Sequence, residues 1–191
     1  GIIEAVGDGV VDFSEGDRVA YCMVLGAYAE RRIIAADRLI PLGLDTTDEV
    51  AAAATLQGLT AHYLVHESWP VRNGDTVLVQ AAAGGVGLLL CQWAKAKGAT
   101  VIGTVGSEQK AAYVTNYGCD YPVVYTNEDF AKKVLELTDQ RGADAIYDAV
   151  GYDTFEKGIE CLAERGRLVS YGQSSGAVSA ISIGCVRARC T

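Results

Sequence analysis

The chain has 191 residues, half of them hydrophobic and 21% charged, and it carries a formal net charge of −8. This length suffices for one complete core, or for one domain and part of another. The acidic balance argues against nucleic acid or an anionic membrane as a partner, because both attract basic surfaces. No apolar run approaches the roughly 20 residues that span a bilayer.

The cysteines and histidines show no metal-binding spacing. The six cysteines are scattered without a CxxC pair, and His62 and His66 are the only histidines. We therefore expect no metal site and no secreted disulfide framework. Cys91 and Cys161 lie in amphipathic patterns and are predicted to be core thiols, which fits a cytoplasmic protein.

Residues 1–45 indicate a small, irregular β unit. Three short β-type runs, at 1–6, 17–22 and 31–36, are separated by turn signals such as GDG and EGD.

From about residue 46 the pattern changes to alternating helices and strands. Thr46 and Glu49 have the spacing of a capping box and open a predicted helix over 46–68. Ser107 and Asn127 are expected to cap later helices. Predicted strands over 75–81, 99–105, 121–125, 143–150 and 166–172 alternate with predicted helices over 86–98, 107–118, 127–137 and 155–162. This alternation predicts an α/β fold with a doubly wound parallel sheet.

The stretch QAAAGGVG, residues 80–87, lies where the first of these strands turns into a helix. Gly84, Gly85 and Gly87 leave the backbone bare at the helix N-terminus, where N–H groups and the helix dipole favour a pyrophosphate. The spacing is A-x-x-G-x-G rather than the full G-x-G-x-x-G of dinucleotide-binding turns. Tight helix–strand packing without a ligand is the alternative, although packing alone does not require three glycines within four residues.

The end of the next strand indicates which dinucleotide is bound. Sheets that bind NAD usually place an Asp or Glu there to accept from the ribose, whereas this chain has GTVGSEQK at 103–110. Ser107 is neutral and Lys110 follows about one helical turn later, which favours the 2′-phosphate of NADPH. Glu108 is expected to point to solvent. An exposed helix lysine without a ligand is the alternative for Lys110.

Ligands of such sheets bind beyond the carboxyl ends of the strands. Tyr125 is placed there either to contact the cofactor or to cap the sheet edge. Val150 and Gly151 leave room for the nicotinamide ribose. The stretch YGQSSG at 171–176 offers amide and hydroxyl groups, although as a bare turn it needs no ligand.

Together these segments resemble a known family. The chain is similar to the zinc-independent NADPH:quinone oxidoreductases, the zeta-crystallin-like branch of the medium-chain dehydrogenase/reductase superfamily. The similarity lies in QGLTAHYL (57–64), GDTVLVQAAAGGVG (74–87), GTVGSEQK (103–110), YDAVG (147–151) and LVSYGQSSG (168–176). It implies a partial GroES-like catalytic β domain over 1–45 and a Rossmann-type NADPH-binding domain of about five strands over 46–184. An atypical tail over 185–191 departs from the family pattern.

The resemblance also implies the positions that contact NADPH. They are Tyr63, Gly85, Val86, Gly106, Ser107, Lys110, Tyr125, Val150, Tyr171, Gly172, Gln173 and Ser174. Tyr63 follows from the resemblance alone, and no catalytic residue is assigned. The implied activity is hydride transfer from NADPH to a small-molecule quinone. Reduction of an enoyl or another α,β-unsaturated carbonyl group is one alternative, and an NADPH-binding fragment without turnover is another.

Two departures from relatives of this fold matter. Zinc alcohol dehydrogenases carry four closely spaced cysteines soon after the GDRV segment, whereas this chain has only Cys22 there. A quinone accepts hydride readily, so we expect reduction without a metal.

The chain also matches only part of a family member, because Gly1 falls inside the catalytic β unit and a sixth strand is missing. We therefore expect a truncated chain of a protein that is a dimer at full length.

Overall fold

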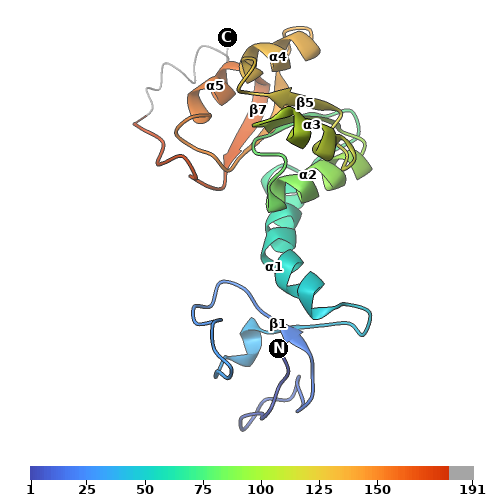
Figure 1. Ribbon diagram of the computed structural model, residues 1–191, viewed down its shortest axis with the longest axis vertical. Coiled ribbons are helices and arrows are strands. Elements are labelled where there is room, and N and C mark those ends of the chain that lie inside the picture. Colours follow the sequence, from blue (N-terminus) through green and yellow to red (C-terminus); the bar gives the residue numbers. More distant parts are fainter. Residues whose placement is uncertain (181–191) are drawn as a thin grey trace. The chain divides into compact units, whose positions relative to one another are not determined.

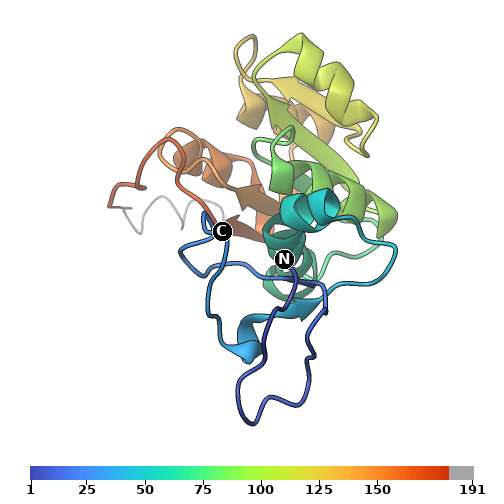
Figure 2. The ribbon, with the colours of Figure 1, turned by 60° about the horizontal axis from the view of Figure 1, so that its bottom comes forward.

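The computed structural model describes residues 1–180. The chain divides into two compact units, Gly1–Leu59 and a second that begins at Thr60 (Figures 1 and 2). The division falls within helix α1 (Asp48–Tyr63) rather than at the 45/46 boundary expected from the sequence. Those domain limits stay a prediction, and the tail over 185–191 lies outside the described residues.

The first unit has little regular structure, and Figure 2 shows its early residues, in blue, mostly as loops. Strand β1 (Val19–Ala20) pairs antiparallel with β2 (Ile40–Pro41), and a 3₁₀ turn, η1, spans Ala36–Arg38.

Two of the strand predictions for this unit are wrong. The run at 31–36 forms no strand, and Ile33 within it is 99% exposed. The run at 1–6 contributes only a single bridge, between Ile2 and Arg18. An apolar run becomes a strand only where a neighbouring strand and a core receive it, and these runs bury little.

The second unit contains the predicted doubly wound sheet. Its strands are β3 (Thr76–Val79), β4 (Thr100–Val105), β5 (Tyr121–Val124), β6 (Ala143–Asp148) and β7 (Leu162–Ser170). They lie in the order β5-β4-β3-β6-β7, and every neighbouring pair is parallel. The helices are α2 (Gly85–Ala96), α3 (Glu108–Thr115), α4 (Phe130–Leu137) and α5 (Phe155–Glu160), with a π-helical turn, η2 (Leu64–Ser68), after α1.

Alternating strand residues build a core on each face of this sheet. Val77 and Val79 face a cluster that contains buried residues of α2, α3 and η2. Leu78, between them, faces a second cluster that contains Phe130 and Val134 of α4. In Figure 1, α4 and α5 accordingly lie together, away from α2 and α3. Strands β3, β4 and β6 are buried on both faces, which explains why they are mostly apolar runs in the sequence.

Helix limits differ from the predictions where several capping residues stand in a row. Thr47, not Thr46, caps α1, because its Oγ1 accepts from the backbone N–H of Val50 at 3.3 Å. Asp129, not Asn127, caps α4 by accepting from the N–H groups of Ala131 and Lys132. The last helix ends at Glu160, and the strand predicted over 166–172 begins earlier, at Leu162.

No helix within residues 1–180 is long and apolar enough to cross a membrane.

Candidate nucleotide-binding site

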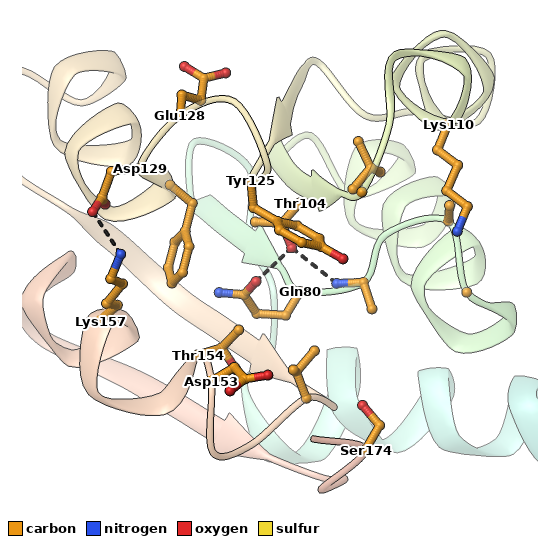
Figure 3. Close-up of a pocket in the computed structure, with 17 residues that line it drawn as sticks. Gln80, Thr104, Lys110, Tyr125, Glu128, Asp129, Asp153, Thr154, Lys157 and Ser174 are labelled. Atoms are coloured by element: carbon orange, nitrogen blue, oxygen red, sulfur yellow. Dashed lines mark hydrogen bonds and ion pairs between the residues drawn. The ribbon is translucent and has the colours of Figure 1, made fainter. Parts of the chain in front are cut away.

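A pocket of about 450 Å³ opens at the carboxyl ends of the central strands (Figure 3). The chain passes from β3 outward to β4 and β5 and then returns to β6 on the other side of β3. Such a reversal of strand order leaves a crevice in which ligands bind. Among the positions expected from the sequence, the pocket is lined by Gly106, Lys110, Tyr125, Val150 and Ser174.

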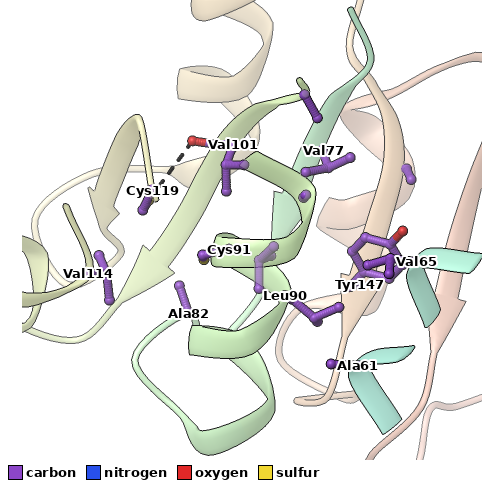
Figure 4. Close-up of a cluster of buried hydrophobic side chains, with 14 of the residues drawn as sticks. Ala61, Val65, Val77, Ala82, Leu90, Cys91, Val101, Val114, Cys119 and Tyr147 are labelled. Atoms are coloured by element: carbon purple, nitrogen blue, oxygen red, sulfur yellow. Dashed lines mark hydrogen bonds between the residues drawn. The ribbon is translucent and has the colours of Figure 1, made fainter. Parts of the chain in front are cut away.

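The glycine turn between β3 and α2 forms one wall of this pocket. Gly84 lines it and is the N-cap of α2. Gly87 lies one turn into the helix, and a Cβ there would be 2.8 Å from the carbonyl oxygen of Ala82. Figure 4 shows Ala82 beside Leu90 and Cys91, in the core that α2 shares with the sheet. Gly87 therefore permits close helix–strand packing, and Gly84 keeps the helix N-terminus open to the pocket.

Thr104, at the end of β4, holds this turn in place. Its Oγ1 accepts from the N–H of Ala81 at 3.1 Å, and its carbonyl oxygen accepts from the N–H of Ala82 at 2.9 Å. Ala81 has φ of 53°, in the left-handed region that non-glycine residues rarely adopt. The two hydrogen bonds stabilise this conformation and fix the turn to the neighbouring strand.

Gln80 is a pocket residue that the sequence analysis did not identify. Its side chain is only 1% exposed, and its Oε1 accepts from Thr104 Oγ1 at 2.6 Å. Its Nε2 is buried and has no hydrogen-bond partner among the described residues. A polar residue at the end of a buried apolar strand is the one signal that could have indicated it.

The segment after β4 combines a helix cap with a cation. Ser107 is the N-cap of α3, as predicted, since its Oγ accepts from the N–H of Lys110 at 3.3 Å. Lys110 lines the pocket, and Ser107 does not. Glu108 is exposed and accepts from the amide of Asn127 at 3.0 Å, away from the pocket lining. The strand end thus presents a lysine and no carboxylate to the pocket.

The far end of the pocket carries an ion pair that the sequence did not reveal. Lys157 Nζ lies 2.8 Å from Asp129 Oδ2. The lysine lowers the pKa of the Asp129 carboxyl, and the carboxylate in turn raises the pKa of Lys157. Figure 3 places this pair and Glu128 across the pocket from Lys110. The pocket is therefore polarised, with Lys110, which has no ion pair among residues 1–180, at one end and the carboxylates of Glu128 and Asp129 at the other.

Hydrogen bonds that are buried or partly buried organise the loop after β6 and join it to the loop after β7. Asp148 is fully buried, and its Oδ1 accepts from the N–H of Val150 at 2.7 Å and of Gly151 at 3.0 Å. Thr154 Oγ1 donates to the same carboxylate at 2.9 Å. Ser175 Oγ donates to the carbonyl oxygen of Val150 at 2.8 Å. These bonds fix the pocket wall that contains Val150.

Several expected positions lie outside the pocket lining. Gly85 and Val86 begin α2 just beyond Gly84. Gly172 packs against the carbonyl of Ala149, where a Cβ would approach to 2.8 Å.

Three further expected positions also lie outside the lining. Tyr63 is 43% exposed at the end of α1, and Gln173 is exposed. Tyr171 is half-buried, and burial is the main cause that raises its pKa. The cofactor contacts of all these positions, like those of the lining residues, stay predictions.

The described residues do not fit a zinc site. Within residues 1–180, no group of three or more His, Cys, Asp or Glu side chains is placed to hold a metal ion. His62 and His66 stack with ring centroids 4.6 Å apart and both meet the edge of Trp93.

The parallel order of strands and the glycine turn define a Rossmann-type α/β domain. The sequence profile of the family described as "Zinc-binding dehydrogenase" matches residues 85–186, more than half of the chain. The chain belongs to this family.

The chain is also similar to individual proteins with more specific names. A quinone oxidoreductase of Pseudomonas aeruginosa is 46% identical over 185 residues, covering 96% of this chain and 57% of the relative. A 2-haloacrylate reductase of a Burkholderia species is 44% identical, covering 95% and 56%. The crystal structure of Escherichia coli quinone oxidoreductase complexed with NADPH superposes with a TM-score of 0.95 at 42% identity, covering 99% of this chain and 58% of that one. The chain thus spans a little over half the length of these relatives.

Proposed function

We propose that this chain is the NADPH-binding part of an NADPH-dependent quinone oxidoreductase. The observation that carries the proposal is the pocket in which Gly84, at the N-terminus of α2, and Lys110 lie together without a carboxylate at the end of β4. The names of the relatives support the same activity, since quinone oxidoreductases are among them and one is complexed with NADPH.

The described residues fit this cofactor part by part. The N-terminus of α2 at Gly84 suits the diphosphate, because backbone N–H groups and the helix dipole favour anions. Lys110 suits the 2′-phosphate, Tyr125 offers a surface for the base, and Val150 leaves room for the nicotinamide ribose. Ser174, after β7, is placed for polar contacts toward the nicotinamide half. NADPH would supply the hydride, while these residues bind it, orient it and exclude water.

The relative that reduces 2-haloacrylate favours a second candidate, reduction of a carbon–carbon double bond conjugated to a carbonyl group. The rates of NADPH oxidation with 1,4-benzoquinone and with an enoyl thioester, measured on the same preparation, distinguish the two. We expect the quinone to be reduced faster. Faster reduction of the thioester would favour the second candidate, and binding without oxidation of NADPH would indicate a nucleotide-binding fragment.

Replacing Lys110 with glutamate is expected to weaken NADPH far more than NADH. The substitution removes a cation and puts an anion beside the 2′-phosphate, which NADH lacks. We expect a loss of about 1.5–3 kcal/mol in NADPH affinity. Fluorescence titration of both reduced cofactors measures it. Lys132→Glu makes the same charge change on α4 outside the pocket lining and serves as the control. An equal effect of Lys110→Glu on both cofactors would remove its role in cofactor choice.

We propose a cytoplasmic location, which agrees with the absence of disulfides among the cysteines of residues 1–180. We also propose that the full-length protein is a dimer, and sedimentation of that protein tests this directly.

A further inference from the structure

The buried amide of Gln80 is not explained by the fold alone. Its Nε2 carries two hydrogens, is shielded from solvent and donates to no described group. A buried donor without an acceptor costs free energy, so native proteins leave few of them. Because Gln80 also lines the pocket, a ligand in the pocket can supply the acceptor that the protein does not.

The hydrogen bonds around Thr104 orient this amide. Thr104 Oγ1 accepts from the N–H of Ala81, which leaves its own hydrogen to donate to Gln80 Oε1 at 2.6 Å. With Oε1 engaged, Nε2 must point away from Thr104. Figure 3 shows it directed away from Lys110, toward the side of the pocket that carries Lys157. The backbone N–H of Gln80 donates to the carbonyl of Tyr147 at 2.9 Å, which fixes the base of the side chain.

Gln80 lies where it can contact the adenine base of a bound NADPH. If the 2′-phosphate lies at Lys110 and the diphosphate at Gly84, the adenosine ribose lies between them. The base is one bond away from that ribose and would then enter the same pocket, which Tyr125 and Gln80 both line. N1, N3 and N7 of adenine are hydrogen-bond acceptors, so each of them complements an amide donor.

We propose that Gln80 is a specificity-determining residue whose Nε2 donates a hydrogen bond to a ring nitrogen of the cofactor's adenine. This inference rests on the proposed function, since it takes NADPH as the ligand. Thr104 is then a positioning residue, because it holds the amide in the orientation that presents the donor.

Cofactor analogues test the proposal without altering the protein. In three analogues of NADPH, adenine N1, N3 or N7 is replaced by carbon, which removes one acceptor at a time. We expect the wild-type chain to bind one of the three about 5- to 10-fold more weakly than NADPH, as for the loss of one hydrogen bond. Equal binding of NADPH and all three analogues would overturn the proposal.

Variants at Gln80 test whether this residue causes the weaker binding of the sensitive analogue. Gln80→Met keeps a similar side-chain volume and removes the donor, so it should bind NADPH more weakly and should no longer distinguish the sensitive analogue. Gln80→Leu provides the same comparison if the methionine variant does not fold. Gln92→Met, on the exposed face of α2, should discriminate as the wild type does. Discrimination retained by the Gln80 variants would overturn the role of this residue.

The outcomes also separate this proposal from the proposed function. A wild-type chain that binds no NADPH contradicts both. A chain that binds NADPH and oxidises it with a quinone, but binds every analogue alike, contradicts only the role of Gln80.

Discussion

Replacing Gly87 with alanine is expected to destabilise the chain and to abolish cofactor binding. A Cβ at this position would lie 2.8 Å from the carbonyl oxygen of Ala82 and 2.9 Å from its carbonyl carbon, and it would also clash with the carbonyl oxygen of Ala81. These are backbone atoms of a turn held by Thr104, so they cannot move aside as a flexible side chain would. Helix α2 must shift away from β3, and the N-terminus of α2 moves with it.

The expected loss is about 1–3 kcal/mol, typical of overpacking in a filled core. For a chain of this size each kcal/mol corresponds to a fall of about 2–4 °C in Tm. Thermal unfolding followed by circular dichroism measures the stability, and fluorescence titration measures NADPH binding.

The matched control for this substitution is Gly58→Ala. Gly58 also lies in a helix, α1, but a Cβ there has open space around it. Alanine is a better helix former than glycine, so Gly58→Ala should leave Tm unchanged or raise the stability by up to about 1 kcal/mol. If Gly87→Ala were as stable as Gly58→Ala and bound NADPH normally, the turn would not be packed as described.

Replacing Asp148 with alanine is the second substitution with a large expected effect. The buried carboxylate accepts from the N–H groups of Val150 and Gly151 and from the hydroxyl of Thr154. Alanine leaves the two N–H groups without their acceptor, while Thr154 keeps only its longer bond of 3.3 Å to the carbonyl oxygen of Gly151. Each buried donor left unpaired costs about 1–3 kcal/mol. We expect a total loss of about 2–4 kcal/mol, because Val150 and Thr154 are partly buried and water can reach them in part.

The same substitution should also weaken NADPH binding, since the loop that Asp148 organises supplies Val150, Asp153 and Thr154 to the pocket. Urea unfolding measures the stability, and titration with NADPH measures the affinity. Asp148→Asn retains one oxygen acceptor and should recover part of both losses. Asp37→Ala, which removes an exposed carboxylate, is the control and should change neither. An alanine variant with unchanged stability would contradict the buried network.

The sheet could be predicted from the sequence because its central strands β3, β4 and β6 are buried on both faces. Runs such as Thr76–Val79 are apolar without interruption, and the helices between them repeat their apolar residues at helical spacing. The first unit could not be predicted in the same way. The run at 31–36 has β-type residues, but whether it pairs depends on a neighbouring strand that local sequence does not specify.

The capping errors have a simple physical origin. In the segments TT at 46–47 and NED at 127–129, adjacent residues are each able to accept hydrogen bonds from a helix N-terminus. Which one does so depends on where the helix begins to pack, and this is a property of the tertiary structure.

Some residues of the candidate site could be predicted from the sequence and others could not, for the same reason. Gly106, Tyr125 and Val150 were predicted because parallel topology brings the carboxyl ends of strands to one edge. Gln80 and the pair of Asp129 with Lys157 were not predicted, because their importance lies in burial and in a contact between α4 and α5. Such features depend on distances between segments remote in sequence, which no local pattern contains.

We propose that the turn at Gly84 and the cation of Lys110 together hold the phosphates of NADPH. Isothermal titration calorimetry of the wild-type chain with NADPH and with NADH measures both affinities. We expect one NADPH bound per chain, with an affinity at least about 10-fold above that for NADH, equivalent to about 1.4 kcal/mol. No binding of NADPH, or tighter binding of NADH, would contradict it.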